Sequence, residues 1–500
     1  MAEVESEHLD PTGEISLETV KKRSVRGVVT LTGRYFVLYA MTLVAQIFLG
    51  AFLTREQFGV YGVVSAAVNF LVYFSDVGLA ASLIQKKEAV SEEDLKTTFT
   101  VQQILVFVLF LVLVLVSGSI RETYHLSQSG IYLLYALGLS LFLSSLKTIP
   151  SVILERSLRF EKVAIANILE NLVYNVILVF LAWKGAGITS FTFAVLGRGV
   201  IGLLTIYILQ PWKPALLVSR NSLSKLLRFG IPYQLNTFIA VVKDDGLTLL
   251  LGRIIGFDAM GILIWAQKWS QMSLRIVMDT VTKVTFPAFA RMQTARDHLA
   301  RSTTRSIFFI TFLTFPAIFG LVILAPVIIK VVPRYEQWTP AMVPLALVSI
   351  NALFASFTTQ ITNLLNAIGR IKTTFFLMLM WALLTWLLIP PLGSLYGVNG
   401  AALGFALVGS SSIVAVCLAK RYVDFSIRDS ILKPLCAAFV MGAAIFILRR
   451  VLPVNVYSVS ILIIVGIVVY SVVIVAFVGA SLIEDARRSF RALFSRNASG

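Results

Sequence analysis

The sequence contains few charged residues and few of the side chains from which soluble active sites are built. Only 14% of the 500 residues are charged, and there are two cysteines and three histidines. In soluble globular chains about a quarter of the residues are charged. The chain also lacks a P-loop, a metal-ligand spacing and a long polar loop that could form a catalytic domain. These absences argue against an enzyme and against a bound metal or other cofactor.

The cysteines and the N-terminus argue against two further features. Cys417 and Cys436 fall in apolar runs, where we expect small buried side chains rather than a structural disulfide. The segment 1–26 is polar, and no short apolar region with a small-residue cleavage site follows it. We therefore predict a cytoplasmic N-terminal segment and no cleaved signal peptide.

Apolar sequence, in contrast, is abundant. Hydrophobic residues make up 57% of the chain, and the mean hydropathy is +0.85. Runs of about 20 apolar residues, long enough to cross a bilayer as helices, recur almost end to end. The sequence predicts an all-α polytopic membrane protein of about fourteen transmembrane helices, at about 27–48, 59–84, 98–118, 130–150, 163–183, 188–210, 229–251, 258–283, 306–331, 341–365, 373–392, 397–419, 434–452 and 456–480.

The basic residues indicate how the chain is oriented. The net charge is +17, but the basic residues are dispersed through the loops, which argues against nucleic-acid binding. Of the 43 Lys and Arg residues, 28 lie in the two termini and the even-numbered loops. Because positive residues favour the cytoplasmic side, we predict that both termini are cytoplasmic. The opposite loops hold only Arg55, Arg121, Lys184, Arg253, Arg334, Arg449 and Arg450.

A weak internal repeat suggests how the spans are grouped. Positions of the first helical hairpin match positions 202 residues later, as Gly59 matches Gly261, and positions of the sixth run match positions 212 residues later, as Gly197 matches Gly409. Chance matching of glycines is the alternative. The offsets favour two six-helix lobes of like orientation. We predict an N-lobe at 27–210, a cytoplasmic linker at 211–228, a C-lobe at 229–419, two added helices at 434–480 and a cytoplasmic tail at 481–500.

Ionisable side chains inside a membrane are costly, so we expect those within the apolar runs to face a cavity. The cations are Arg34, Lys147, Arg198, Lys243, Lys268, Arg275, Lys283 and Lys330. The main candidate anions are Asp76, Asp244, Asp245 and Asp279. Because the cations outnumber the anions, the sequence predicts an anionic partner that arrives from outside.

Three runs place polar side chains three or four residues apart and so on one helical face. These faces predict a hydrophilic lumen between the helices. An alternative for the last set is that Arg275 and Asp279 form an ion pair that only holds the helix. The sets are Ser65, Asn69, Tyr73 and Asp76; Ser140, Ser144, Lys147 and Ser151; and Lys268, Gln271, Arg275 and Asp279.

Two other segments carry distinctive patterns. In the seventh run, Pro232 predicts a kink, and the polar string 243–246 interrupts the apolar sequence. Adjacent Asp244 and Asp245 point about 100 degrees apart on a helix, so both can enter one cavity only if the helix is broken there. Near the C-terminus, residues 482–496 alternate apolar residues with arginines, which predicts a membrane-surface helix on anionic lipid.

Four strings resemble a known family. The strongest are GLAASLIQKKEAVSEEDLKTTFTVQQ, from Gly78 to Gln103, and FPAFARMQ, from Phe286 to Gln293. LLNAIGRIK at 364–372 and YGVNGAALG at 396–404 support them. The chain is similar over essentially its whole length to the polysaccharide flippases of the multidrug, oligosaccharidyl-lipid and polysaccharide exporter superfamily. The resemblance is greatest to the branch that exports colanic-acid-like and teichuronic-acid-like repeat units.

The resemblance implies a cationic cavity between two lobes, open alternately to each side of a bacterial inner membrane, and an undecaprenyl pyrophosphate-linked oligosaccharide as substrate. It maps the pyrophosphate contacts onto Arg34, Lys268 and Arg275. The further candidate substrate-binding cations are Lys147, Arg198 and Lys243, and the candidate carboxylates for ion coupling or gating are Asp76, Asp244 and Asp279. The expected partners are the lipid-linked oligosaccharide, membrane lipids, and the polymerase and glycosyltransferases of the same pathway.

Two other functions remain open at this point. A drug or metabolite antiporter of the same superfamily is the first alternative, although a cationic cavity disfavours the cations that this branch mostly carries. A membrane enzyme of the sugar pathway is the second, and it would be expected to carry a large periplasmic loop. The sequence has no such loop.

Overall fold

The computed structural model describes residues 17–293 and 295–478, and all regular secondary structure in this part of the chain is helical. This confirms the predicted all-α fold class. The chain divides into two compact units, residues 1–261 and 262–500, which are described one at a time. The predicted tail at 481–500 and most of the N-terminal segment 1–26 lie outside the described residues.

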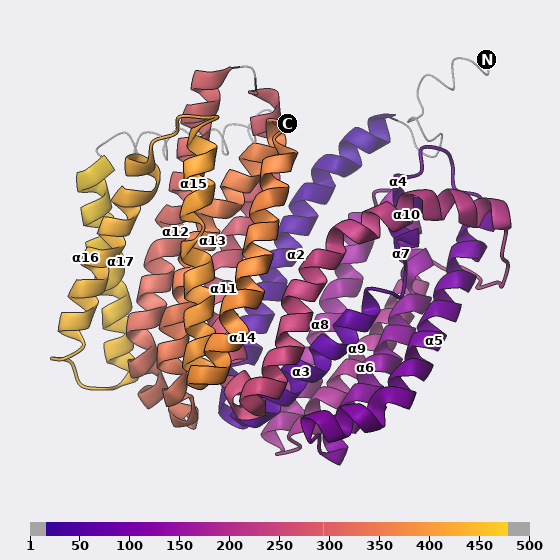
Figure 1. The fold of residues 1–500 in the computed structure, drawn as a ribbon, viewed down its shortest axis with the longest axis horizontal. Helices are drawn as coiled ribbons and strands as arrows, with labels where there is room; N and C mark the ends of the chain where they lie inside the picture. Colours follow the sequence, from indigo (N-terminus) through magenta and orange to yellow (C-terminus); the bar gives the residue numbers. More distant parts are fainter. Residues whose placement is uncertain (1–16, 294, 479–500) are drawn as a thin grey trace. The chain divides into compact units, whose positions relative to one another are not determined.

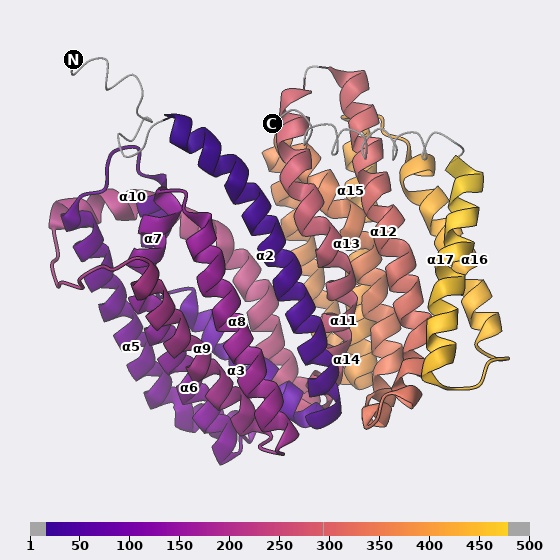
Figure 2. The same cartoon turned by 180° about the vertical axis from the view of Figure 1, so that it is seen from behind.

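The helices of the first unit are α2 (Leu17–Phe52), α3 (Arg55–Val72), α4 (Leu79–Gln85), α5 (Glu92–Tyr124), α6 (Gln128–Leu146), α7 (Thr148–Arg156), α8 (Phe160–Trp183), α9 (Ile188–Leu209), α10 (Arg220–Val241), the π-helical turn η1 (Val242–Gly246) and the start of α11 (Leu247–Arg291). In both ribbon views the long helices α5, α6, α8 and α9 run side by side (Figures 1 and 2). α8 packs against α2 and α9, and α6 packs against α9, α5 and α3. The shorter α4, α7 and α10 pack around the beginning of α5.

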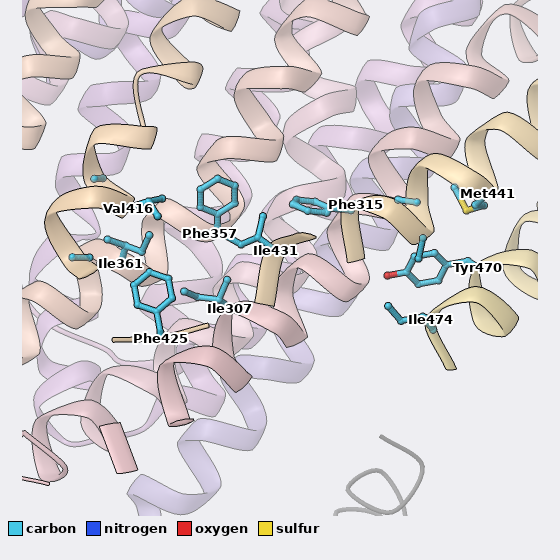
Figure 3. Close-up of a cluster of buried hydrophobic side chains, with 14 of the residues drawn as sticks. Ile307, Phe315, Phe357, Ile361, Val416, Phe425, Ile431, Met441, Tyr470 and Ile474 are labelled. Carbon is cyan, nitrogen blue, oxygen red and sulfur yellow. The ribbon is translucent and has the colours of Figure 1, made fainter. Parts of the chain in front are cut away.

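The second unit contains the rest of α11, then α12 (Arg296–Val331), η2 (Tyr335–Ala341), α13 (Met342–Ala367), α14 (Ile371–Ser410), α15 (Ile413–Lys420), η3 (Arg428–Leu432), α16 (Lys433–Leu448) and α17 (Val456–Val478). α12 packs against α13 and α16, and α16 packs against α17. Figure 3 shows part of the shared core, including Phe315, Phe357 and Met441. Tyr470 of α17 donates a hydrogen bond to the Phe312 carbonyl at 2.8 Å, which ties the last helix to α12.

Eleven helical ranges in the described residues are long and apolar enough to cross a membrane. One of them, Phe238–Arg275, covers most of two predicted spans, and another, Ile371–Lys420, contains two predicted spans whole. Non-helical backbone angles at Gly256 in the first and at Gly397 in the second mark where the direction changes. The eleven ranges also lack the second predicted span, because the structure divides it between α3 and α4. The prediction of about fourteen spans is therefore approximate.

Local sequence fixes where α3 and α5 begin. The Thr54 hydroxyl accepts a hydrogen bond from the Gln57 backbone N–H, and the Gln57 side chain accepts one from the Thr54 backbone N–H. Ser91 and Asp94 form the same reciprocal pair at the start of α5. Such capping boxes satisfy backbone donors that would otherwise lack partners. They set the register of two helices whose side chains line cavities.

The first unit contains a backbone contact that only glycine permits. A Cβ atom at Gly59 would lie 1.9 Å from the Phe257 carbonyl oxygen, and one at Gly261 would lie 1.8 Å from the Arg55 carbonyl oxygen. These two glycines are a matched pair of the internal repeat. We expect Gly59→Ala to destabilise the purified protein by roughly 1–3 kcal/mol, because the backbones would have to separate. Thermal unfolding in detergent measures this change.

Gly118→Ala provides the control for the Gly59 substitution. A Cβ atom there has no neighbour within 4 Å, and alanine favours a helix interior over glycine by up to about 1 kcal/mol. We expect the thermal stability of this variant to be unchanged or higher. Equal melting temperatures for Gly59→Ala and Gly118→Ala would contradict the close approach.

Candidate functional site

A polar cavity of about 340 Å³ lies inside the first unit, between α3, α6, α8 and α9. Most of its lining side chains carry a hydroxyl, an amide or a charge. The structure brings together here the polar faces predicted for the second and fourth spans, without Tyr73, Asp76 and Ser151. The cavity is lined by Tyr61, Ser65, Asn69, Leu137, Ser140, Ser144, Lys147, Glu170, Tyr174, Val195, Arg198 and Gly199.

A buried carboxylate joins two of the predicted cations in this cavity. Glu170 of α8 has a side chain that is only 4% exposed. The Nζ atom of Lys147, at the end of α6, donates to Glu170 Oε1 at 2.5 Å. Arg198 of α9 reaches the other carboxylate oxygen with Nε at 3.7 Å, and its side chain is 48% exposed. Two cations therefore share one anion, so the cavity has a net positive charge, and Arg198 is the more loosely held cation.

Glycine makes room for this group. A Cβ atom at Gly202 of α9 would lie 2.4 Å from Glu170 Oε1. One at Gly199, one turn earlier, would lie 2.8 Å from a methyl carbon of Leu143. Because neither glycine has a side chain, α9 can approach α6 and α8 closely and leave the carboxylate beside the cavity.

Hydroxyl groups and aromatic rings complete the lining. Tyr174 donates a hydrogen bond to the Tyr61 hydroxyl at 3.1 Å, and the Tyr61 ring stacks on Phe191 with the centroids 4.0 Å apart. The Arg198 guanidinium lies 5.9 Å from the centre of the Tyr174 ring. The buried Ser65 hydroxyl has no hydrogen-bond partner in the described part of the chain. The Ser65 hydroxyl and the Arg198 guanidinium can donate to the oxygen atoms of a polar ligand.

The interruption predicted in the seventh span is a π-helical turn, η1, rather than a loop. Lys243 forms an ion pair with its neighbour Asp244, whose side chain is 68% exposed. Asp245 instead accepts a hydrogen bond from the side chain of Asn69, which lines the polar cavity. The two adjacent carboxylates therefore diverge, and Asp245 rather than Asp244 is the one that contacts a cavity residue. Single π turns within α-helices often accompany functional sites.

Asp76 has a local structural contact. Its carboxylate oxygens accept the Ala80 backbone N–H at 3.1 and 3.2 Å, at the beginning of α4. The turn before α4 lies against α10, where a Cβ atom at Gly78 would be 2.4 Å from the Gly230 carbonyl oxygen. Gly78 also has a φ angle of 75°, in the left-handed region that favours glycine. The first residue of the GLAASLIQ string is therefore required by the turn.

The three cations named first for pyrophosphate lie outside this cavity. Arg34 is on α2, with a buried Nε that has no hydrogen-bond partner among the described residues. Burial raises the pKa of Glu155 on α7, and nearby Arg34 partly counteracts that effect. Lys268 and Arg275 belong to the second unit, where both side chains are exposed on α11. The side chain of Asp279 lies outside the described part of the chain.

Sequence reasoning did not select Glu170 or single out Asp245. A carboxylate within an apolar run was the available signal for Glu170, the same signal that selected Asp76. Asn167 and Tyr174 lie three residues before and four residues after Glu170, so this span also has a polar helical face that was not used, and the charged partners of Glu170 come from elsewhere in the chain. The residue that organises the charges of the cavity was therefore missed, although Lys147 and Arg198 were selected.

Sequence comparisons agree with the resemblance noted above. A family model described as "Polysaccharide biosynthesis protein" matches residues 48–343, more than half of the 500 residues. Lipopolysaccharide biosynthesis protein WzxC of Escherichia coli (strain K12) is 24% identical over 395 residues, which cover 78% of this chain and 79% of that protein. Succinoglycan biosynthesis transport protein ExoT of Rhizobium meliloti (strain 1021) is 22% identical over 375 residues, which cover 75% of this chain and 73% of that protein.

Solved structures share the fold. Lipid II flippase MurJ, in an inward closed conformation, superposes with a TM-score of 0.73 at 17% identity, covering 89% of this chain and 98% of that one. An inward-facing multidrug resistance MATE family transporter of the MOP superfamily gives a TM-score of 0.59 at 15% identity, covering 79% of this chain and 95% of that one. At these identities the likeness concerns the fold, and it is greater for the flippase.

Proposed function

The chain belongs to the polysaccharide biosynthesis protein family, and on this premise we propose that it moves a lipid-linked oligosaccharide across a bacterial inner membrane. The substrate would be an undecaprenyl pyrophosphate-linked repeat unit, carried by alternating access from the cytoplasmic to the outer leaflet for surface polysaccharide synthesis. Relatives named for lipopolysaccharide biosynthesis and succinoglycan transport support this assignment.

The observation that carries the proposal is the net positive polar cavity of the first unit. A pyrophosphate diester has about two negative charges, and charge-assisted hydrogen bonds from arginine and lysine suit its oxygen atoms. Lys147 and Arg198 supply such donors beside the cavity hydroxyl groups. Sugars present many hydroxyl groups, which can bond to Asn69, Ser140 and similar side chains. The cavity therefore has the polarity that an anionic glycolipid headgroup requires.

We assign Glu170 the role of competing with the substrate for the two cations. When the cavity holds no ligand, the carboxylate partly compensates the charges of Lys147 and Arg198 inside the protein. A phosphate that enters must displace Glu170 from at least one of them, and the carboxylate then helps to expel the phosphate. Asp76, Asp244 and Asp279 stay proposed for coupling or gating, with Asp245 added because it contacts Asn69.

The cations outside this cavity complete the proposal. Arg34 on α2, Lys243 on η1, and Lys268 and Arg275 on α11 remain proposed substrate contacts. A transporter needs more than one set of contacts because its ligand must be held in states that face either side. The polymerase and glycosyltransferases of the pathway are proposed partners on the same grounds of family membership.

A drug or metabolite antiporter is the weaker proposal. The fold is shared with a multidrug transporter, but a cavity with two cations and one carboxylate repels cationic drugs. The decisive experiment deletes the gene and follows the repeat units. We expect lipid-linked repeat units to accumulate on the cytoplasmic face and surface polysaccharide to disappear. Normal surface polysaccharide together with increased drug sensitivity would favour the antiporter instead.

The proposed orientation leads to a prediction about labelling. The two native cysteines, Cys417 and Cys436, are first replaced. The substitution Glu336→Cys in this background should then react with a membrane-impermeant maleimide added to intact spheroplasts. A single cysteine at Glu88→Cys should react only after the membrane is opened. Both native side chains are exposed, and the charge bias puts their loops on opposite sides. Reaction of the residue 88 variant in intact spheroplasts would reverse the orientation.

A further inference from the structure

The GLAASLIQKKEAVSEEDL string builds a rigid loop between α4 and α5. Arg156, at the end of α7, donates from Nη1 to the carbonyl oxygens of Leu83 at 2.7 Å and Lys86 at 2.9 Å, and from Nη2 to that of Glu88 at 3.1 Å. One guanidinium therefore holds the last turn of α4 and the first residues after it. Because the backbone is fixed in this way, the points from which the side chains of the loop extend are set.

Asp94 joins this loop to α10. It is buried, accepts hydrogen bonds from Lys86 Nζ at 2.5 Å and from the Ser222 hydroxyl at 2.5 Å, and caps α5 through the Ser91 backbone N–H at 3.1 Å. The linker before α10 is also tied to α5, because the Ser219 backbone N–H donates to Thr97 at 3.0 Å. Three segments distant in sequence thus form one connected surface.

A second cavity, of about 270 Å³, opens at this junction. Its lining holds three lysines and two carboxylates and so has a net positive charge. Asp94 compensates Lys86, while exposed Lys87 and Lys225, which share the lining with Glu88, have no ion pair among the described residues. One wall is apolar and comes from α10. None of its residues lines the polar cavity between α3, α6, α8 and α9. The lining consists of Ser82, Gln85, Lys86, Lys87, Glu88, Asp94, Lys225, Leu226 and Phe229.

We propose that this second cavity binds the phosphate of an anionic lipid headgroup. Lys87 and Lys225 supply two ammonium groups on rigid supports, which suits a phosphate oxygen group. The Phe229 ring supplies an apolar surface that a glycerolipid can use and a free phosphate does not. Leu226, also in the lining, is almost fully buried, and Ile84, which directly precedes the lining residue Gln85, is 42% exposed. The site lies at the beginning of α5, the end that the charge bias assigns to the cytoplasmic leaflet.

The residues of this site are distinct from those of the polar cavity, and its test does not involve transport. Short-chain dihexanoyl phosphatidylglycerol is titrated into the full-length protein in detergent, with binding followed by calorimetry. We expect Lys87→Gln combined with Lys225→Gln to weaken binding about twenty-five-fold, from roughly fivefold for each lysine near a lipid phosphate. Dihexanoyl phosphatidylcholine, which has no net charge, should bind weakly to every form.

The matched control removes two other lysines of the same region. Lys96→Gln combined with Lys213→Gln changes the net charge equally, and neither residue lines the cavity. Phosphatidylglycerol binding should be unchanged in this control, and thermal unfolding should be alike for both variants. Equal loss in both variants would overturn the proposal, since the lipid would then respond to overall charge. Unchanged lipid binding in the cavity variant, with loss of inorganic phosphate binding, would overturn the assignment to a lipid.

Discussion

Replacing Arg198 by alanine is expected to reduce export of the surface polysaccharide by roughly tenfold to a hundredfold while the protein stays folded. The guanidinium is about half exposed to the cavity and touches Glu170 only at 3.7 Å, so its removal costs the fold little. A charged hydrogen bond to phosphate is worth roughly 1.5–3 kcal/mol, which corresponds to that range. Export in a gene-deletion strain, normalised to the amount of protein in the membrane, measures the effect.

Two comparisons separate substrate binding from structure at this position. Arg198→Lys keeps the charge but loses the fork of donors, so export should be partly retained. Lys184→Ala, at the C-terminal end of α8, removes an exposed cation that lies over the Trp183 ring and should leave export unchanged. Wild-type export by Arg198→Ala would show that the cavity does not bind the anionic headgroup through this residue.

Lys147 is less suitable for this experiment because its partner Glu170 is buried. Glu170 is 4% exposed and Lys147 is its 2.5 Å partner. Removing one member of a buried pair leaves an uncompensated charge and typically costs 3–5 kcal/mol of stability, on the order of the free energy that holds many domains folded. Loss of export in Lys147→Ala would therefore not distinguish a missing substrate contact from a missing protein.

The helices could be predicted from the sequence because a helix in lipid has a simple requirement. Every backbone donor and acceptor must be satisfied within the span, so an apolar run of sufficient length becomes a helix. The second span was less predictable because its local sequence ends α3 at Val72 and places a turn at Val77 and Gly78, both with positive φ. Gly256 and Gly397 also fall between predicted spans, and their non-helical backbone angles separate two helical segments at each place.

The candidate site could be predicted where its residues share one helix. Ser65 and Asn69, four residues apart, and Ser140 and Ser144, also four apart, line the same cavity, as their spacing suggested. The pairing of Glu170 could not be predicted in this way, because its partner Lys147 is 23 residues away and on a different helix. Pairing between helices depends on how they pack, and helical spacing within one span carries no information about it.

The same limit applies to Asp244 and Asp245. Their sequence indicates that the two carboxylates diverge, and the structure agrees. It does not indicate which of them approaches another helix, since this depends on how the π turn rotates the segment against α3. The hydrogen bond from Asn69 identifies Asp245. The family strings also gave incomplete information about function. Gly78 and Asp94 lie within these strings, but their contacts stabilise the fold and do not indicate which ligand is bound.

Glu170→Gln is expected to have two opposite effects, tighter binding of the substrate and slower export. The amide keeps the shape of the side chain but removes the negative charge that compensates Lys147 and Arg198. An anionic ligand then meets two uncompensated cations, and its affinity should rise about tenfold or more, since charges about 4 Å apart interact by up to a few kcal/mol in a partly screened site. Because tighter binding in one state slows the return to the other, export should fall by a similar factor.

Binding and export are measured separately to test this mechanism. Purified protein is titrated with a pyrophosphate-linked polyprenyl sugar, and export in the gene-deletion strain is normalised to the amount of folded protein in the membrane, because this substitution also breaks the buried pair with Lys147. Glu161→Gln, on the first turn of the same helix α8 and outside the cavity lining, should change neither quantity. If Glu170→Gln lowered both affinity and export, the carboxylate would be a part of the binding site rather than a competitor for it. Tighter binding with impaired export, in contrast, requires a group that is displaced by the substrate and afterwards drives it out.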